Sequence, residues 1–297
     1  MCRIAGIYNK TKSQAELSSL VGKMCRLQKH GGPDDEGIYE DAQQPLVLGH
    51  RRLSLIDLSS AGHQPMPYAD GRYWISYNGE LYNFPELKKE LTDAGFVFTS
   101  HSDTEVILAA YAAWGTNAFR RFNGMFAFVL WDKIRHTLIL VRDPGGIKPL
   151  YFAANEEGLA FASEVRGFGV LPWLQEENPN WPVYLLAYGH IPEPVTTLRN
   201  VRPLPKGSFL SYAVQSGDWS IESFSHYPFL EKIDSRDEAV SGIREGLSSA
   251  VKRHLLSDAP IGVFLSGGLD SSIISILAAR HHTAALKTLS IAFEEAK

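Results

Sequence analysis

Met1-Cys2-Arg3-Ile4-Ala5-Gly6-Ile7 opens the chain and combines a chemical feature with a structural one. A cysteine directly behind the initiator methionine is small enough for that methionine to be removed. The product would carry a thiol and an α-amino group on one residue, and the amine, with a pKa of about 8, can accept the thiol proton. The apolar run that follows predicts a strand over residues 4–8 that buries and fixes the terminus. Most cysteines at the second position have no catalytic role, so the rest of the chain has to show whether Cys2 is a nucleophile.

The composition is that of an ordinary globular protein, with 297 residues of which 44% are hydrophobic and 21% charged. A prior of about 150 residues per domain predicts two domains. The net charge of -4 gives no electrostatic reason to expect nucleic acid or a membrane surface as partner. Cys2 and Cys25 are too few for a disulfide framework and indicate a reducing compartment. With no apolar run of ~20 residues and no signal-peptide pattern, the sequence predicts a cytoplasmic protein.

Short strand patterns separated by Gly/Pro turns dominate residues 1 to about 170. Strand composition occurs over residues 46–50, 73–77, 125–131, 136–142, 151–154 and 158–163. Helical spacing occurs over residues 85–91, opened by Pro85, and over residues 104–114, where Ser102 or Asp103 suits the N-cap. Because strands and helices come in separate groups, the pattern favours an α+β or stacked-sheet domain over a parallel sheet.

The pattern changes in the last part of the chain. Residues 171–237 are Pro-rich and aromatic, and they predict a connecting region that packs on the first domain and ends in a hairpin over 207–212. A helix over 238–255, a buried strand over 261–265, a helix over 273–280 and a buried strand over 286–293 follow, which is the opening of a doubly wound α/β domain. The predicted domains are 1–212 with the connecting region, a linker over 213–235, and an incomplete second domain over 236–297.

The loop Ser266-Gly267-Gly268-Leu269-Asp270-Ser271-Ser272 lies between a predicted strand and a predicted helix. Its glycines let the backbone approach a bound group, and the helix N-terminus presents N–H donors with a partial positive charge. The serine hydroxyls add donors, so the expected ligand is an anion, with pyrophosphate the best fit. Asp270 would then lie close to a metal ion or to the N–H groups. No Gly-Lys-Ser/Thr follows, which excludes a Walker motif; the alternative is an ordinary Gly/Ser turn that caps a helix.

These features together give the chain a family resemblance. Residues 266–272 resemble the pyrophosphate loop of the ATP pyrophosphatase superfamily. With Cys2 they resemble the glutamine-hydrolysing asparagine synthetase family, whose N-terminal half is a glutaminase of the N-terminal-nucleophile type. Further matching motifs follow in order at residues 30–34, 52–54, 78–83, 102–105, 142–144, 146–151 and 162–164. The resemblance covers nearly the whole chain and implies stacked antiparallel sheets in an αββα arrangement, followed by the beginning of an α/β ATP-pyrophosphatase domain.

A glutaminase must hold both ends of a free amino acid and stabilise an oxyanion, and the resemblance assigns residues to these tasks. Arg52 suits the α-carboxylate, because a guanidinium binds a carboxylate with paired donors. Asp103 suits the α-ammonium, with Glu80 and the backbone near Gly79 assisting. The Asn78 side chain and the Gly79 backbone N–H would form the oxyanion hole, each donor contributing roughly 3 kcal/mol. The alternatives are a surface ion pair for Arg52, a helix cap for Asp103, and a type I′ turn at residues 78–79.

The remaining candidates are assigned structural roles. His30, His50 and His63 have no metal-ligand spacing, so we interpret them as structural or surface groups and predict no metal site from them. Cys25 lies in a helical stretch and is predicted to be a small buried hydrophobe.

For the second domain, the resemblance implies ATP on the loop, with adenine-side contacts at Leu265 and Ile291 and Mg²⁺ bridging the phosphates. ATP and Mg²⁺ would act as a substrate complex, and the glutaminase step would need no cofactor. The family adenylates the side-chain carboxylate of aspartate, releases pyrophosphate, and attacks the acyl-adenylate with ammonia from the glutaminase site. The implied partners are glutamine, aspartate and ATP, without nucleic acid or membrane, and a homodimer is the assembly left open.

The sequence departs from the family pattern at three positions and in its length. Position 3 is Arg where the family has Gly, position 31 is Gly where the turn usually has Arg, and Gly145 replaces a usual leucine. A charge lost at 31 and one gained at 3 would compensate if the two positions are close. Family members continue for several hundred residues, so we expect a fragment or truncated product that hydrolyses glutamine but does not make asparagine.

Two other functions remain open at this stage. A relative with the same two folds could use another acceptor, as in enzymes that close lactam rings. Such relatives often lose the terminal cysteine, so Cys2 favours glutamine. The second alternative is a catalytically silent fragment that acts only as an interaction module, which Arg3 and the short second domain would explain.

Overall fold

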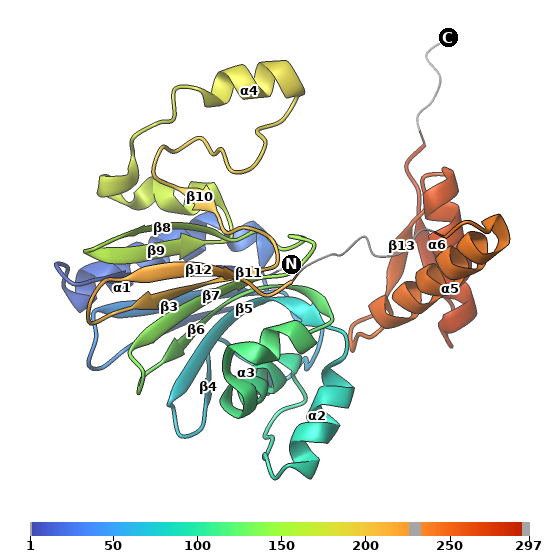
Figure 1. Ribbon diagram of the computed structural model, residues 1–297, viewed down its shortest axis with the longest axis horizontal. Helices are drawn as coiled ribbons and strands as arrows, with labels where there is room; N and C mark the ends of the chain where they lie inside the picture. The colour runs from blue at the N-terminus through green and yellow to red at the C-terminus, as the bar shows by residue number, and fades with distance from the viewer. Residues whose placement is uncertain (1, 226–232, 293–297) are drawn as a thin grey trace. The chain divides into compact units, whose positions relative to one another are not determined.

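The computed structural model describes residues 2–225 and 233–292 and divides the chain into two compact units, Met1–His226 and Tyr227–Lys297. The first unit is built on two six-stranded antiparallel sheets that stack on each other (Figure 1). One sheet has the order β10-β8-β9-β1-β3-β2 and consists of β1 (Arg3–Asn9), β2 (Asp35–Glu40), β3 (Leu46–Arg52), β8 (Tyr151–Asn155), β9 (Gly158–Ala162) and β10 (Arg202–Pro203). The other has the order β12-β11-β7-β6-β5-β4 and consists of β4 (Met66–Tyr68), β5 (Tyr73–Leu81), β6 (Gly124–Asp132), β7 (Thr137–Arg142), β11 (Ser208–Ala213) and β12 (Trp219–Ser223).

Helices cover the outer faces of the two sheets. Helix α1 (Gln14–Leu27) packs on the first sheet through apolar residues such as Leu17 and Val21. Helices α2 (Phe84–Asp93) and α3 (Asp103–Trp114) pack on the second sheet and share a core with β5 and β6. The predicted αββα arrangement is therefore confirmed.

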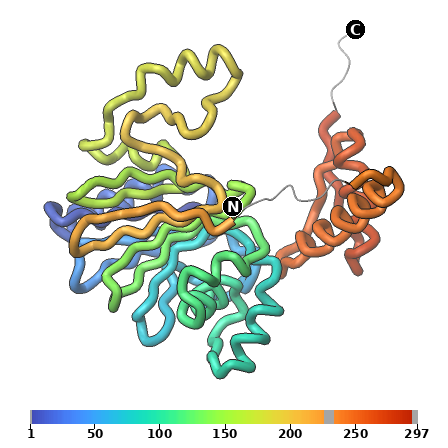
Figure 2. Tube along the Cα trace, in the orientation of Figure 1, coloured from blue at the N-terminus to red at the C-terminus, as the bar shows by residue number. Residues whose placement is uncertain are grey.

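Strand β1 is buried on both faces, which explains its nearly continuous apolar sequence. Ile4 and Tyr8 belong to the core between the sheets, whereas Ala5 and Ile7 belong to the core under α1. β1 pairs with β3 on one side and with β9 on the other, so that segments far apart in the sequence flank it (Figure 2). The residue before β1 is thereby held at a fixed place, because both neighbouring strands fix the register of the strand.

Two predictions for the end of the first unit are corrected. The hairpin expected over 207–212 is one strand, β11, which pairs with β7 and with β12. Strand β12 lies inside the predicted linker over 213–235, so the first unit extends further than expected. This edge strand is mostly exposed and has only five residues, so the alternation of Trp219 and Ile221 with polar residues is too short to be decisive. Helix α4 (Trp181–Tyr188) lies in the Pro-rich region and has no buried residue.

The second unit has the predicted helix, strand, helix, strand order, as α5 (Arg236–His254), β13 (Gly262–Phe264), α6 (Leu269–His281) and β14 (Lys287–Leu289). The two strands pair in parallel, as a β-α-β unit requires. The expectation that both strands are buried is wrong for the described residues, because Phe264 is 81% exposed and Leu289 is 56% exposed. Two strands and two helices of this length bury only a small core around Val251 and Leu277. No helix in residues 2–225 and 233–292 has the length and apolar character to span a bilayer.

Candidate active site

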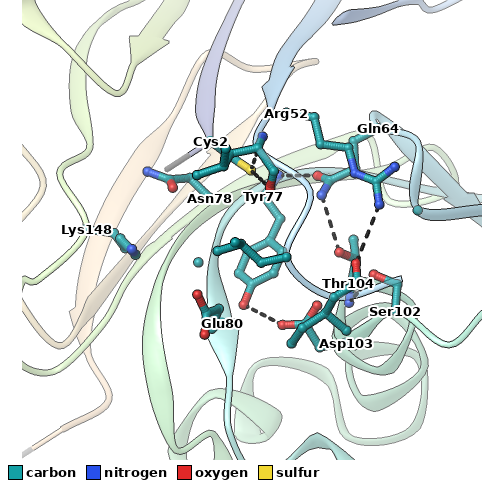
Figure 3. Close-up of a pocket in the computed structure, with 15 residues that line it drawn as sticks. Cys2, Arg52, Gln64, Tyr77, Asn78, Glu80, Ser102, Asp103, Thr104 and Lys148 are labelled. Atoms are coloured by element: carbon teal, nitrogen blue, oxygen red, sulfur yellow. Dashed lines mark hydrogen bonds between the residues drawn. The ribbon is translucent and has the colours of Figure 1, made fainter. Parts of the chain in front are cut away.

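A pocket in the first unit brings together all six residues that the sequence predicts for glutamine chemistry (Figure 3). The predicted residues that line it are Cys2, Arg52, Asn78, Gly79, Glu80 and Asp103. They come from the start of β1, the end of β3, the C-terminal half of β5 and the start of α3. Residues separated by up to a hundred positions therefore meet because the two sheets and α3 converge here.

Cys2 is held at the pocket by hydrogen bonds on both sides. Ile4 donates its backbone N–H to Ser163 Oγ at 2.9 Å, and Ser163 donates its own N–H to the Ile4 carbonyl at 2.9 Å. These two hydrogen bonds fix the start of β1, directly after Cys2. The Leu53 backbone N–H points at the Cys2 sulfur with a distance of 3.3 Å. Burial raises the pKa of the Cys2 thiol, and the Leu53 N–H and the Arg52 charge oppose that rise. The resting sulfur is therefore a thiol that needs a base when it reacts.

The Arg52 guanidinium is hydrogen-bonded to backbone carbonyls of the residues that follow it. Its guanidinium donates to the carbonyls of Ser59, at 3.0 Å, and of Asp57. A Cβ at Gly62 would lie 2.0 Å from Arg52 Nη2, so a glycine at this position makes room for the guanidinium. The side chain is buried and lines the pocket, which excludes the surface ion pair as its explanation.

The segment that follows Arg52 is held in place by the turn Gly32-Pro33-Asp34. Asp34 accepts the backbone N–H of Ser54 at 2.8 Å and donates its own N–H to the Arg52 carbonyl at 3.0 Å. Two of the motifs noted in the sequence, residues 30–34 and 52–54, are therefore parts of one structure. Its effect is to hold the Leu53 amide against the thiol.

Asn78 and Gly79 lie within β5, so the alternative of a type I′ turn is wrong. The Asn78 side chain is fully buried, lines the pocket, and has no hydrogen-bond partner for either its oxygen or its nitrogen among the described residues. A buried amide without partners costs free energy unless a ligand supplies them. A Cβ on Gly79 would lie 2.3 Å from the Met125 carbonyl, which explains why this position has no side chain.

Asp103 is the first residue of α3, and the cap of that helix is Ser102, whose side chain accepts the Thr104 N–H. The helix-cap alternative for Asp103 is therefore wrong. Asp103 Oδ2 accepts hydrogen bonds from the Tyr77 hydroxyl and from the Leu81 N–H, both at 2.9 Å. Burial raises the pKa of Asp103 to about 6 against the effect of these donors. A buried carboxylate of this kind can bind a cation.

Glu80 is the second carboxylate of the pocket. Burial raises the pKa of Glu80, and the nearby Lys148 ammonium opposes the rise. Lys148 also lines the pocket, although the sequence analysis assigned no role to it (Figure 3). Its side chain is almost completely buried, and burial lowers the pKa of Lys148. The pocket thus contains two cations and two carboxylates, the charge pattern that a zwitterion requires.

The loop before Lys148 is folded around Asp143. Its carboxylate accepts the backbone N–H groups of Ile147 at 3.0 Å and of Lys148 at 2.9 Å. Arg142 donates to the Lys148 carbonyl at 3.1 Å. The motif over residues 142–151 therefore fixes the position of Lys148. In the sequence, the only signal that pointed to this buried lysine was the motif that contains it.

None of the three histidines considered above lines the pocket. His50 is fully buried with its Nε2 2.9 Å from the Tyr77 carbonyl, and burial lowers the pKa of His50 to about 4. His63 lies 2.6 Å from an Asp35 oxygen, and His30 lies 2.9 Å from a Glu164 oxygen. Cys25 is buried in α1, as predicted. Among the described residues, no group of three or more His, Cys, Asp or Glu side chains is arranged to hold a metal ion.

The Ser-Gly-Gly loop lies in the second unit between β13 and α6. Ser266 Oγ and Ser271 Oγ are 3.0 Å apart, and Gly267 adopts a left-handed φ of +81° that favours glycine. The loop and the residue before it contain seven of the predicted contact residues: Leu265, Ser266, Gly267, Gly268, Asp270, Ser271 and Ser272. The eighth, Ile291, lies just after β14 and is 83% exposed. The amides of the first turn of α6 have no acceptor within the helix, which is the arrangement that binds anions.

Comparison with known proteins identifies the family. The sequence profile of the glutamine amidotransferase domain matches residues 1–225. The chain belongs to the glutamine amidotransferase family. The profile of asparagine synthase matches residues 242–297 of the chain. The first match covers the unit that contains the pocket, and the second covers the Ser-Gly-Gly loop.

The curated relatives are longer than this chain. It is 37% identical over 297 residues to asparagine synthetase [glutamine-hydrolyzing] 1 of Bacillus subtilis (strain 168), a match that covers 99% of this chain and 46% of that protein. It is 36% identical over 298 residues to a putative asparagine synthetase [glutamine-hydrolyzing] of Mycobacterium bovis (strain ATCC BAA-935 / AF2122/97), covering 94% and 45%. The chain therefore spans about half the length of the curated relatives it matches.

A solved structure agrees on the fold. The glutamine phosphoribosylpyrophosphate (PRPP) amidotransferase from B. subtilis, complexed with ADP and GMP, matches this chain with a TM-score of 0.56 and 17% sequence identity. The match covers 97% of this chain and 65% of that chain. At this identity the likeness shows the fold alone.

Proposed function

We propose that this chain hydrolyses glutamine to glutamate and ammonia, with Cys2 as the nucleophile after removal of Met1. The observation that carries the proposal is the pocket, whose lining includes a thiol, a buried Asn78 amide without partners among the described residues, the Arg52 guanidinium and the Asp103 carboxylate. A free amino acid has a carboxylate and an ammonium that match these two charges. Its side-chain amide would then face the thiol.

The chemistry follows from the groups at the start of β1. The α-amine of the processed Cys2 takes the thiol proton while the sulfur forms a bond to the side-chain carbonyl carbon of glutamine. The resulting oxyanion would be held by the Asn78 side-chain N–H and the Gly79 backbone N–H. The C–N bond then breaks and the amide nitrogen leaves as ammonia with the proton from the amine. Water cleaves the thioester to glutamate and returns a proton to the sulfur.

The raised pKa of the thiol supports a mechanism in which a base acts during the attack. A preformed thiolate would require the opposite shift, with a cation dominating over burial. Here burial is the largest influence on Cys2, so the sulfur stays protonated until the amine removes the proton. A base is therefore needed during the attack, and removal of Met1 would supply one in the amine of Cys2 itself.

We propose further that the ammonia serves asparagine synthesis, in which aspartate and ATP form a β-aspartyl-adenylate. The support is the asparagine synthase match over residues 242–297 and the printed names of the relatives. The loop fits a phosphate group, because Ser266, Ser271 and Ser272 place their hydroxyls beside the first turn of α6. Mg²⁺ would neutralise phosphate charge there, with Asp270 the acidic residue on the same loop.

The test of the first proposal is glutamate release from glutamine by the purified chain, beside a Cys2→Ala variant. Intact-mass measurement first establishes whether Met1 has been removed. Activity that disappears in the variant supports the nucleophile, and no glutamate from correctly processed protein overturns it in favour of an interaction module. Product analysis with aspartate, ATP and glutamine tests the second proposal: asparagine as the amidated product supports it, and a different amidated product would contradict it and indicate another acceptor.

A further inference from the structure

Arg3 and Gly31 share one space behind the nucleophile. A Cβ built on Gly31 would lie 2.6 Å from Arg3 Cζ, 2.7 Å from its Cγ and 2.8 Å from its Nε. These distances are shorter than real contacts, and they involve the stem of the arginine as well as its tip. Any side chain at position 31 would therefore displace the Arg3 side chain. The two departures from the family pattern noted in the sequence are in contact.

The Arg3 guanidinium binds the main chain of the nucleophile itself. Arg3 Nη1 donates to the Cys2 carbonyl oxygen at 3.0 Å, and Nε donates to Glu164 Oε1 at 2.5 Å. The Cys2 carbonyl carbon is bonded to the Cα that carries both the thiol and the α-amine. A group that holds this carbonyl therefore limits the rotation of the nucleophile and of its base together.

The electrostatic surroundings show that the cation at position 3 is accommodated by specific partners. Arg3 lies directly opposite Arg51 in the β1–β3 pairing, where two like charges are unfavourable. Each arginine has its own carboxylate: Arg51 Nη1 lies 2.6 Å from Glu36, and Arg3 lies 2.5 Å from Glu164. The Arg3 side chain is only 14% exposed. Arg3 is therefore held by specific contacts in a largely buried position, unlike a solvated arginine on the surface.

We propose that Arg3 is a positioning residue for Cys2, that Glu164 orients its guanidinium, and that the absence of a side chain at Gly31 makes this placement sterically accessible. The proposal rests on the proposed glutaminase function. It predicts that Arg3 affects the step in which the thiol attacks and leaves glutamine binding nearly unchanged, because Arg3 does not line the pocket.

The first test compares Arg3→Met, which keeps much of the bulk, with Arg166→Met as the matched control. Arg166 also pairs with Glu164, at 3.1 Å, but its side chain is 59% exposed and binds no atom of Cys2. Arg3→Met is expected to lower kcat for glutamate release about tenfold with KM for glutamine changed less than threefold. Arg166→Met should stay within twofold of the wild type. An Arg3→Met enzyme with kcat within twofold of the wild type would overturn the proposal.

The second test uses Gly31→Ala in two backgrounds. In the wild type the added methyl displaces Arg3 and should lower kcat by an amount similar to Arg3→Met. In the Arg3→Gly background the space is already vacant, so Gly31→Ala should have no further effect beyond twofold. Equal losses in both backgrounds would show that position 31 acts independently of Arg3 and would contradict the shared-space argument.

A third measurement separates failure of this proposal from failure of the glutaminase proposal. Iodoacetamide alkylation of Cys2, followed by peptide mass, needs no turnover. Loss of the Arg3 contact should loosen the terminus and raise the Cys2 alkylation rate at least threefold in Arg3→Met, and leave it unchanged in Arg166→Met. If the wild type releases no glutamate but this difference is present, the glutaminase proposal fails and the positioning role of Arg3 stands. Equal alkylation rates in folded variants overturn the positioning role.

Discussion

The Tyr77 hydroxyl donates a hydrogen bond to Asp103 Oδ2 at 2.9 Å and thereby connects β5, which carries the proposed oxyanion donors, to α3, which carries the proposed ammonium partner. Asp103 also accepts the Leu81 N–H, so that two donors from the same segment of chain aim at one carboxylate oxygen. The two halves of the glutamine pocket are thus connected through one buried carboxylate, and its protonation state should control substrate binding.

The pH dependence of glutamine hydrolysis should have an acidic limb set by Asp103. Burial raises the pKa of Asp103 to about 6, and only the ionised carboxylate can pair with the α-ammonium of glutamine. As the pH falls through 6, kcat/KM for glutamine should fall because KM rises. Asp103→Asn should raise KM at pH 7.5 and remove the rise of KM near pH 6, while the loss of kcat from protonation of the Cys2 α-amine remains. A wild-type profile of kcat/KM that stays flat from pH 7.5 to 5 would contradict the assignment.

The same residue should make the folded protein less stable at neutral pH. A carboxyl whose pKa rises on folding is easier to ionise in the unfolded chain, so its cost is present above pH 6 and absent below about pH 4. A rise from 3.8 to about 6 corresponds to about 3 kcal/mol. Asp103→Asn should therefore raise the free energy of unfolding at pH 7.5 by up to about 3 kcal/mol. Urea titrations at pH 7.5 and 4.5 test this, and a difference that does not shrink at pH 4.5 argues against it.

Asn78 should contribute to the rate and little to binding. Its side-chain amide is buried without partners among the described residues, which fits a donor kept for an oxyanion. Asn78→Ala should lower kcat by about 10²-fold, the usual loss for one oxyanion donor, with a small change in KM. Stopped assays of glutamate release give both constants. A large rise in KM with kcat unchanged would move Asn78 from the oxyanion hole to ground-state binding.

Lys148 should influence the pocket through Glu80. Its ammonium opposes the burial that raises the pKa of Glu80, so Lys148→Met should raise that pKa further and make the carboxyl easier to protonate. KM for glutamine should increase, and the increase should grow as the pH falls. Lys148→Arg keeps the charge and serves as the control. If Lys148→Met and Lys148→Arg have the same pH profile, charge at this position is not the reason for its burial.

The sequence and its family resemblance were sufficient to predict the two stacked sheets, most of their strands and the six residues that line the pocket. Each of these six residues lies in a local motif with its own chemistry. Arg52 ends β3, Asn78 and Gly79 lie within β5, and Asp103 opens α3. These positions could be related before any distance was known, since the family resemblance assigned them to one substrate.

Other features depend on contacts that no local pattern contains. Lys148 is buried because the Asp143 carboxylate folds the loop before it, and a lysine in sequence gives no sign of burial. Tyr77 matters for the site only because its hydroxyl donates a hydrogen bond to the Asp103 carboxylate of α3. Exposure of Phe264 and Leu289 differs from expectation because burial of a strand depends on neighbours on both its sides. The contact of Arg3 with Gly31 likewise needs the tertiary structure.

Gly79 should tolerate no side chain. A Cβ there would lie 2.3 Å from the Met125 carbonyl and 2.7 Å from Phe126 Cα, and backbone atoms in a paired strand cannot move aside. Gly79→Ala should separate β5 from β6, lower the free energy of unfolding by about 3 kcal/mol and abolish glutamate release. Gly169→Ala is the matched control, since a Cβ at Gly169 meets nothing within 4 Å, and it should change stability by less than about 0.5 kcal/mol. Thermal unfolding of both variants decides the question: equal midpoints would mean that β5 and β6 can separate without cost and that the close approach at Gly79 is unimportant.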